Sequence, residues 1–275
     1  MEHIKSALQK AGVLSENHQP AEKTVTPVQV KPSPTSSQKV RDTAPPALRT
    51  VKIDPKHLEK KRIVSQSMSD PNHIAFNLLR TRVRKAMFDN KWKTLAVTSP
   101  TPGCGKTMVS LNLAFSLARS PGLKTVLVDL DLKRPSIAPT LNVEPKSSIA
   151  QFLLGRAKPE DCFVQVDENL IVGLNSGHTP SSSELIQAPN MLDLFSFIQT
   201  SLTPDVVVFD LPPMRSSDDA LAFLPRVDTA LLVVAAGTTT TTEVDECELQ
   251  ISELDKLLGL VLNKCENAST EEYYY

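Results

Sequence analysis

The sequence lacks the features that place a protein in a membrane or cross-link it. No run of 18 apolar residues occurs among its 275 residues, so we predict no transmembrane helix. The polar residues Glu2, His3 and Lys5 interrupt the apolar ones near the N-terminus, which leaves no signal-peptide core there. The 4 cysteines are scattered without a CxxC pair, which excludes a zinc ribbon and a disulfide framework. We therefore expect a cytoplasmic protein.

Charge is nearly balanced over the whole chain but not along it. The net charge is −1, which excludes a dominant electrostatic binder of nucleic acid. The Pro/Ser/Thr-rich residues 1–62, however, hold 12 Lys and Arg against 6 Asp and Glu, and no aromatic residue. A segment without aromatics buries little apolar area, so we predict that residues 1–62 are mostly disordered. Apolar residues at helical spacing over 2–11 allow one short helix, either as a docking element or as part of a solvated tail.

Residues 63–265 alternate between apolar strands and helical patterns, and they precede a flexible acidic tail, 266–275. Strands such as Val206–Phe209 are almost continuously apolar, which is typical of a parallel sheet covered on both faces. The sequence therefore predicts an α/β fold with a mostly parallel sheet and helices on both faces. Strands are predicted at Thr94–Ser99, Lys124–Asp129, Asn169–Leu174, Asp205–Asp210, Thr229–Ala235 and Leu257–Asn263. Helices are predicted at Lys106–Arg119, Glu184–Thr200 and Thr242–Lys256, with a further helix that Asp70 caps and Pro71 begins.

A phosphate-binding loop follows the first of these strands. The segment Thr94–Thr107 reads TLAVTSPTPGCGKT, so a strand enters a glycine-containing turn that opens directly into a helix. That context predicts a P-loop, in which backbone amides surround phosphate oxygens and a lysine reaches the β- and γ-phosphates. Cys104 within the loop is either a small filler or a site of inhibitory oxidation. The candidate nucleotide-binding residues are Pro102, Gly103, Cys104, Gly105, Lys106, Thr107 and Met108.

Acidic residues follow two other predicted strands. Asp129 and Asp131 come after Val126–Val128, and Asp210 comes after Val206–Phe209. The carboxyl ends of parallel strands meet at one edge, so we expect these carboxylates to lie beside the P-loop. Mg²⁺ prefers such oxygen ligands, and we assign Thr107, Asp129 and Asp210 to the metal. The candidate catalytic residues are Lys106, Asp129, Asp131 and Asp210, with Asp131 accepting the proton of the acceptor hydroxyl.

All 3 tyrosines of the chain stand at its end. Tyr273, Tyr274 and Tyr275 follow the acidic pair Glu271–Glu272. An exposed tail seldom keeps three aromatic residues without a use, so the cluster is a candidate phosphate acceptor. The alternative is a merely adhesive tail.

Together these motifs resemble the bacterial tyrosine kinases of capsule and exopolysaccharide synthesis, within the MinD/ParA class of P-loop ATPases. The resemblance covers about residues 63–275 and rests on a Walker A loop at Pro100–Thr107, a Walker A′ motif at Val126–Lys133 and a Walker B motif at Val206–Pro213. It implies a P-loop NTPase fold, ATP and Mg²⁺ as cofactors, and autophosphorylation of Tyr273–Tyr275 between neighbouring subunits. It also implies a homo-oligomer that a separate membrane chain-length regulator activates and recruits to the inner face of the plasma membrane.

The chain departs from the family pattern at several positions. Thr101 stands where MinD and ParA proteins carry a second lysine, which favours a kinase over a positioning ATPase. Lys133 replaces the arginine of Walker A′, and lysine does not reproduce bidentate arginine contacts. The oligomerisation motif ExxRxxR aligns with Ile74, Asn77 and Arg80, so two of its three positions are lost. Besides the kinase, two alternatives stay open: an ATPase that positions cargo without tyrosine phosphorylation, and a nucleotide-binding scaffold without turnover.

Overall fold

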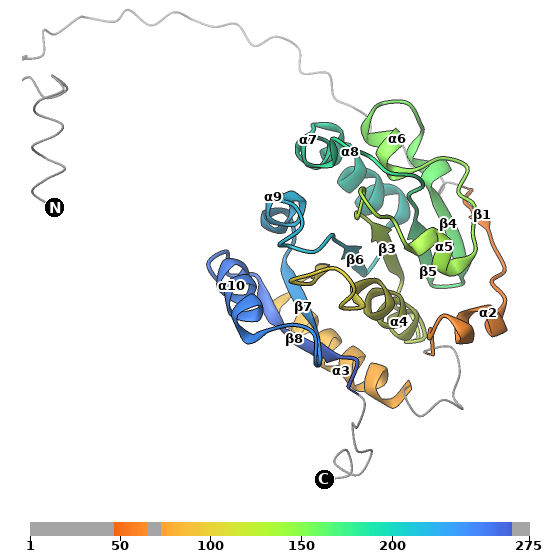
Figure 1. Ribbon diagram of the computed structural model, residues 1–275. Helices are drawn as coiled ribbons and strands as arrows, with labels where there is room; N and C mark the ends of the chain where they lie inside the picture. Colours follow the sequence, from red (N-terminus) through yellow and green to blue (C-terminus); the bar gives the residue numbers. More distant parts are fainter. Residues whose placement is uncertain (1–46, 65–72, 266–275) are drawn as a thin grey trace, which may run out of the picture. The chain divides into compact units, whose positions relative to one another are not determined.

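The computed structural model describes residues 47–64 and 73–265, which form a mostly parallel sheet with helices on both faces (Figure 1). Within these residues the sheet has eight strands in the order β1-β4-β5-β3-β6-β2-β7-β8. Among these eight described strands, only the β4–β5 pair is antiparallel. The strands are β1 (Arg49–Thr50), β2 (Thr94–Thr98), β3 (Thr125–Asp129), β4 (Phe163–Asp167), β5 (Leu170–Gly173), β6 (Val206–Asp210), β7 (Thr229–Ala235) and β8 (Leu257–Asn263).

The centre of the sheet holds the strands that the apolar runs predicted. Every residue of β2, β3, β6 and β7 is buried, because helices cover both faces of these strands. The register places Asp129 at the end of β3 directly beside Asp210 at the end of β6. The predicted α/β fold of the P-loop NTPase type is confirmed, and the two strand-end carboxylates lie at one edge of the sheet.

Two groups of helices enclose the sheet. One face carries α2 (Pro55–Lys60), α3 (His73–Asn90), α4 (Lys106–Ala118) and α5 (Ile137–Leu141). The other carries α6 (Ile149–Leu153), α7 (Ser182–Gln187), α8 (Asn190–Phe197), the π-helical turn η2 (Ile198–Leu202), α9 (Asp219–Phe223) and α10 (Thr241–Ser252). Short 3₁₀ turns, η1 (Pro159–Cys162) and η3 (Leu224–Arg226), complete the described elements. No helix in the described ranges is long and apolar enough to span a membrane.

The folded region begins before the predicted boundary at residue 63. Strand β1 pairs with β4, and the Val51 amide donates to the carbonyl of Gln165 at 2.9 Å. Helix α2 is capped by Asp54 and buries Leu58, which is 1% exposed. Residues 47–62 are therefore ordered without aromatic residues, because β1 pairs with β4 and Leu58 is buried. The predicted helix over 2–11, the Asp70–Pro71 helix start and the tail 266–275 lie outside the described residues.

The prediction of one continuous helix over Glu184–Thr200 is wrong. Residues 182–187 and 190–197 form two helices, α7 and α8, separated at Pro189. Ala188 before the proline adopts an extended backbone with ψ 152°, because the proline ring disfavours a helical residue at that position.

Candidate nucleotide site

The loop between β2 and α4 has the backbone geometry of a phosphate-binding turn. Gly103 and Gly105 have φ of +82° and +89°, conformations that glycine adopts without a steric penalty. Gly105 begins α4 as its N-cap, and within the described part of the chain no side chain caps that helix, whose first turn carries no acidic residue. Asn263 at the end of β8 donates from Nδ2 to the carbonyl of Cys104 at 2.8 Å and braces the loop. The amides and the positive end of the helix dipole together suit the binding of a phosphate group.

Lys106 at the start of α4 lies between two carboxylates. Its Nζ is 2.9 Å from Asp131 Oδ2 and 3.5 Å from Asp210 Oδ2. Burial opposes the charge of this ammonium, but the carboxylates of Asp210 and Asp131 outweigh burial and raise its pKa. The lysine is therefore held as a cation at the position where a P-loop lysine meets phosphate oxygens.

Asp210 receives two hydroxyl groups from α4. Thr107 Oγ1 donates to its Oδ2 at 2.6 Å, and Ser110 Oγ donates to its Oδ1 at 3.0 Å. Burial raises the pKa of Asp210, while Lys106 and the two hydroxyls favour its charged form. Ser136 Oγ donates to Thr107 Oγ1 at 2.8 Å. Sequence reasoning missed Ser110 and Ser136, although the spacing of Ser110, one turn after Thr107 on the same helix face, could have identified it.

Asp129 shapes the loop after β3. Its carboxylate is fully buried and accepts the backbone amides of Asp131, Ser136 and Ile137 at 3.2, 3.2 and 3.1 Å. Burial, reinforced by the charge of Asp210, raises the pKa of Asp129 to about 8. These bonds fold the segment that carries Asp131 back over the P-loop.

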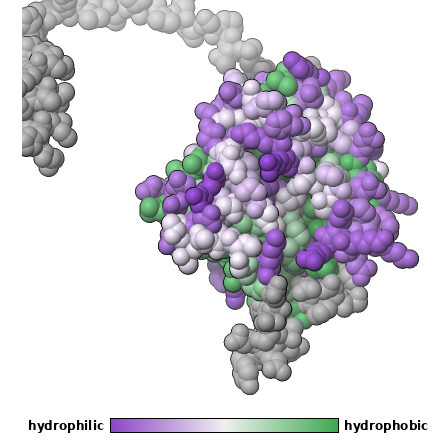
Figure 2. All heavy atoms as spheres, in the orientation of Figure 1, coloured by the Kyte–Doolittle hydropathy of each residue, from purple (hydrophilic) through white to green (hydrophobic). Residues whose placement is uncertain are grey.

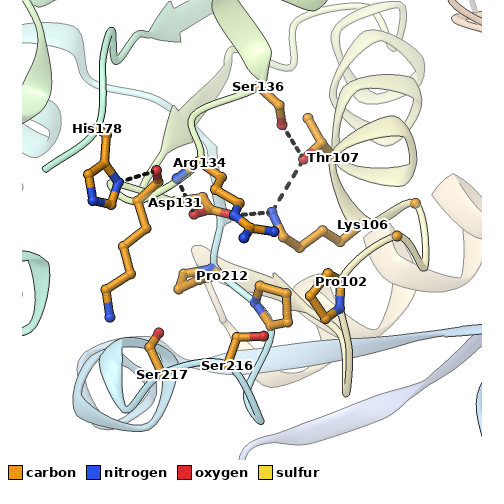
Figure 3. A pocket seen from close by; sticks show the side chains of 14 residues that line it. Pro102, Lys106, Thr107, Asp131, Arg134, Ser136, His178, Pro212, Ser216 and Ser217 are labelled. Atoms are coloured by element: carbon orange, nitrogen blue, oxygen red, sulfur yellow. Dashed lines mark hydrogen bonds and ion pairs between the residues drawn. The ribbon is translucent and has the colours of Figure 1, made fainter. Parts of the chain in front are cut away.

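A cavity of about 510 Å³ opens beside these residues (Figure 3). Of the predicted site residues, Pro102, Gly103, Gly105, Lys106, Thr107 and Asp131 line it, whereas Cys104, Met108, Asp129 and Asp210 do not. Three of the remaining lining residues belong to the Walker A′ and Walker B motifs without having been assigned as site residues: Lys133, Pro212 and Pro213. Sequence reasoning missed the other five: Arg134, Ser136, His178, Ser216 and Ser217. Cys104 is buried under the loop, with its Sγ 3.5 Å from the hydroxyls of Thr101 and Thr239.

The residues fit a nucleotide with Mg²⁺. Thr107 Oγ1 and the carboxylate of Asp210 supply oxygen donors that this ion prefers, with Asp129 beside Asp210 at the end of the neighbouring strand. Within the described ranges, no three His, Cys, Asp or Glu side chains are arranged to hold a metal ion by themselves.

Comparison with known proteins agrees with this geometry. Residues 95–274 match the model of the CobQ/CobB/MinD/ParA nucleotide binding domain family. The tyrosine-protein kinase CpsD of Streptococcus pneumoniae serotype 4 (strain ATCC BAA-334 / TIGR4) is 31% identical over 192 residues, which cover 69% of this chain and 82% of CpsD. The chain belongs to the bacterial tyrosine kinases of that nucleotide-binding family.

Solved structures support the assignment of the chain to the bacterial tyrosine kinases. The chimerical protein CapA2B2 is 26% identical, with a TM-score of 0.70 over 81% of the kinase and 96% of that chain. The kinase domain of the Escherichia coli tyrosine kinase ETK is 27% identical, with a TM-score of 0.67 over 76% of the kinase and 82% of that chain. The predicted acceptor residues, Tyr273, Tyr274 and Tyr275, lie outside the part of the kinase that the structure describes.

Proposed function

We propose that the kinase transfers the γ-phosphoryl group of ATP to Tyr273, Tyr274 and Tyr275 and thereby regulates the polymerisation or export of a capsule or exopolysaccharide. The observation that carries this proposal is the placement of Lys106 between Asp131 and Asp210, with Asp131 on the cavity wall. CpsD is named a tyrosine-protein kinase, and CapB of Staphylococcus aureus a putative tyrosine-protein kinase. The Rhizobium meliloti relative ExoP is named a succinoglycan biosynthesis transport protein.

Each residue of the site has a distinct role in the proposed reaction. The P-loop amides and Lys106 hold the β- and γ-phosphates and balance their charge. Thr107 and Asp210, with Asp129 behind them, serve Mg²⁺, which when bound neutralises charge on the phosphate oxygens. Asp131 accepts the phenolic proton as the tyrosine oxygen bonds to the γ-phosphorus. The bond from that phosphorus to the bridging oxygen then breaks, and ADP leaves.

Phosphorylation of the tail would change its charge. Each phosphate adds about 1.5–2 negative charges beside Glu271 and Glu272, so repulsion favours release of the tail from a neighbouring active site. We infer a homo-oligomer whose assembly depends on this charge. We also infer a membrane chain-length regulator that activates the kinase and recruits it to the inner face of the plasma membrane.

Phosphate mapping tests the proposed reaction. The full chain is incubated with Mg·ATP, with and without the regulator's cytoplasmic segment, and its C-terminal peptide is analysed by mass spectrometry. We expect phosphate on Tyr273–Tyr275, and a loss of at least about 100-fold in Lys106→Met, because the phosphates lose their protein cation. A variant with all three tyrosines changed to Phe controls for other acceptor sites. Hydrolysis without phosphotyrosine would contradict the proposal and favour a positioning ATPase, whereas binding without turnover would favour a scaffold.

A further inference from the structure

A second lysine of the cavity, in the loop after β3, is held by the loop after β5 and by helix α9. Lys133, after β3, has its carbonyl oxygen 2.8 Å from His178 Nδ1 in the loop after β5. The Thr179 amide donates to the carbonyl of Leu132 at 3.0 Å. The Lys133 ammonium is 3.5 Å from Oδ1 of Asp219 in α9, beyond β6. Backbone and side chain of Lys133 are therefore both fixed at the cavity wall.

Asp219 is an unusual partner because it is completely buried. Its side chain is 0% exposed, and neither carboxylate oxygen has a hydrogen-bond partner within the described residues. An uncompensated buried carboxylate is strongly unfavourable, so Asp219 favours an ammonium beside it. The Lys133 side chain is 33% exposed and lines the cavity. The buried end of the pair thus anchors a cation whose other side faces the ligand space.

The two lysines of the cavity differ in what they can bind. Lys106 lies beside two carboxylates and occupies the phosphate-binding loop. Lys133 has one buried partner, and its neighbours on the cavity wall include the exposed side chains of Arg134 and His178. Figure 3 places His178 across Asp131 from Lys106, on the side away from the P-loop. An acceptor tyrosine that reaches Asp131 from that side brings its flanking residues toward this basic wall.

We propose that Lys133, positioned by Asp219, recognises acidic residues next to the acceptor tyrosine, so that the site selects tyrosines with acidic flanks. This inference rests on the proposed function and specifies its substrate class. The chain's own acceptor fits the chemistry, because Glu271 and Glu272 directly precede Tyr273. Asp219 acts as a positioning residue: it fixes the ammonium in advance, which reduces the entropy lost when the acidic segment binds.

Peptide binding tests this recognition without requiring phosphate transfer. Fluorescein-labelled ASTEEYYY and ASTQQYYY differ only in charge, and their affinities for the full chain are measured by anisotropy with Mg²⁺ and a non-hydrolysable ATP analogue. We expect wild type to bind the acidic peptide about five- to tenfold more tightly than the neutral one. Asp219→Asn and Lys133→Gln should bind both peptides equally, and Lys133→Arg should keep the preference. Affinity for a fluorescent ADP is measured in each variant.

Three outcomes overturn the proposal: equal binding of both peptides by wild type, an unchanged preference in Asp219→Asn, or a parallel loss of affinity for both peptides and for ADP in that variant. The last would assign Asp219 to the fold or to the nucleotide. Phosphate transfer to the same peptides separates this inference from the proposed function. If the preference for the acidic peptide depends on Lys133 but no phosphate is transferred, the recognition of acidic flanks is supported and the kinase reaction is contradicted. If phosphate is transferred to both peptides without any preference in binding, only the recognition of acidic flanks is contradicted.

Discussion

Two glycines of the P-loop have similar left-handed backbones but different surroundings. A Cβ at Gly103 would have no atom within 4 Å, whereas a Cβ at Gly105 would meet Nδ2 of Asn263. Asn263 in turn holds the carbonyl of Cys104. The close approach of the loop to β8 therefore requires glycine at 105 for space as well as for conformation, and at 103 for conformation alone.

Substitution by alanine should separate these two requirements. Gly103→Ala should cost about 1–2 kcal/mol for its left-handed backbone. Gly105→Ala should cost the same amount and a further ~1–3 kcal/mol from overpacking against Asn263, with a matching loss of nucleotide affinity. Denaturant unfolding and titration with a fluorescent nucleotide measure both effects. Equal losses in the two variants would show that Asn263 moves aside without cost.

At the scale of elements, Asp228 joins the starts of β2 and β7. Its Oδ2 accepts the backbone amides of Lys93 and Thr94 at 2.8 and 2.9 Å, and the Thr94 hydroxyl at 2.8 Å. Burial opposes its charge, but the hydrogen bonds from Lys93 and Thr94 lower its pKa below the ordinary value of 3.8. One carboxylate thus fixes the position of the strand that leads into the P-loop.

The contribution of Asp228 to stability should depend on pH. Because its folded pKa is lowered, its stabilising effect is complete above about pH 4 and is lost as pH falls through the folded pKa. Asp228→Ala should lower the free energy of unfolding by about 1–3 kcal/mol at pH 7, because backbone donors lose their acceptor. Asp228→Asn keeps an acceptor and should lose less. Denaturant titrations from pH 7 to pH 3 should show the wild-type advantage over Asp228→Asn shrinking in acid; a constant difference would contradict this role.

Helix α3 carries the three positions that align with the oligomerisation motif, Ile74, Asn77 and Arg80. Arg80 Nη1 donates to the carbonyl of Ser116 at 3.4 Å, and Ser116 Oγ donates to Asn77 Oδ1 at 3.3 Å. Both contacts tie α3 to α4 within one chain. The remaining position, Ile74, is 42% exposed. Two of the three positions therefore take part in packing inside the domain.

The sequence predicted the elements whose pattern comes from burial on both faces. Strands β2, β3, β6 and β7 are continuous apolar runs, and the glycine-lysine-threonine turn marks the start of α4. Strand β1 consists of the exposed residues Arg49 and Thr50, so no pattern marks it, and only its pairing with β4 creates it. Likewise, Ser136 joins the site through a contact with Thr107 of α4, 29 residues away in the sequence, which no local spacing encodes.

At the scale of the whole molecule, residues 47–62 close one edge of the sheet. The side chain of Asn112 in α4 accepts the amide of Val64 at 2.8 Å and donates to the carbonyl of Arg62 at 2.9 Å. Arg49 Nη2 donates to the carbonyl of Glu144 at 2.6 Å. These bonds and the buried Leu58 attach the segment to the body that carries the nucleotide site.

Truncation should show that this segment belongs to the fold. A chain that begins at residue 63 should be about 2–4 kcal/mol less stable than one that begins at residue 47, because it loses Leu58 and exposes the edge of β4. That difference corresponds to a fall of roughly 5–15 °C in melting temperature, measured by calorimetry. The chain that begins at 47 should melt like the full chain. Leu58→Ala in the chain that begins at residue 47 is a milder control. If the chains that begin at residues 47 and 63 melt at the same temperature, residues 47–62 do not stabilise the fold.

The order of the strands in the sheet has a consequence for synthesis of the chain. Strand β2 pairs with β6 and β7, and the register joins Thr94 to Val207 and Leu95 to Thr229. A ribosome that adds ~5–20 residues per second needs roughly 5–20 s to make the ~110 residues between β2 and β6. During that time β2 emerges as an apolar segment without its partners. The nascent kinase therefore carries this apolar segment unpaired until β6 and β7 are made, and the strands that position its nucleotide site come together only after β7.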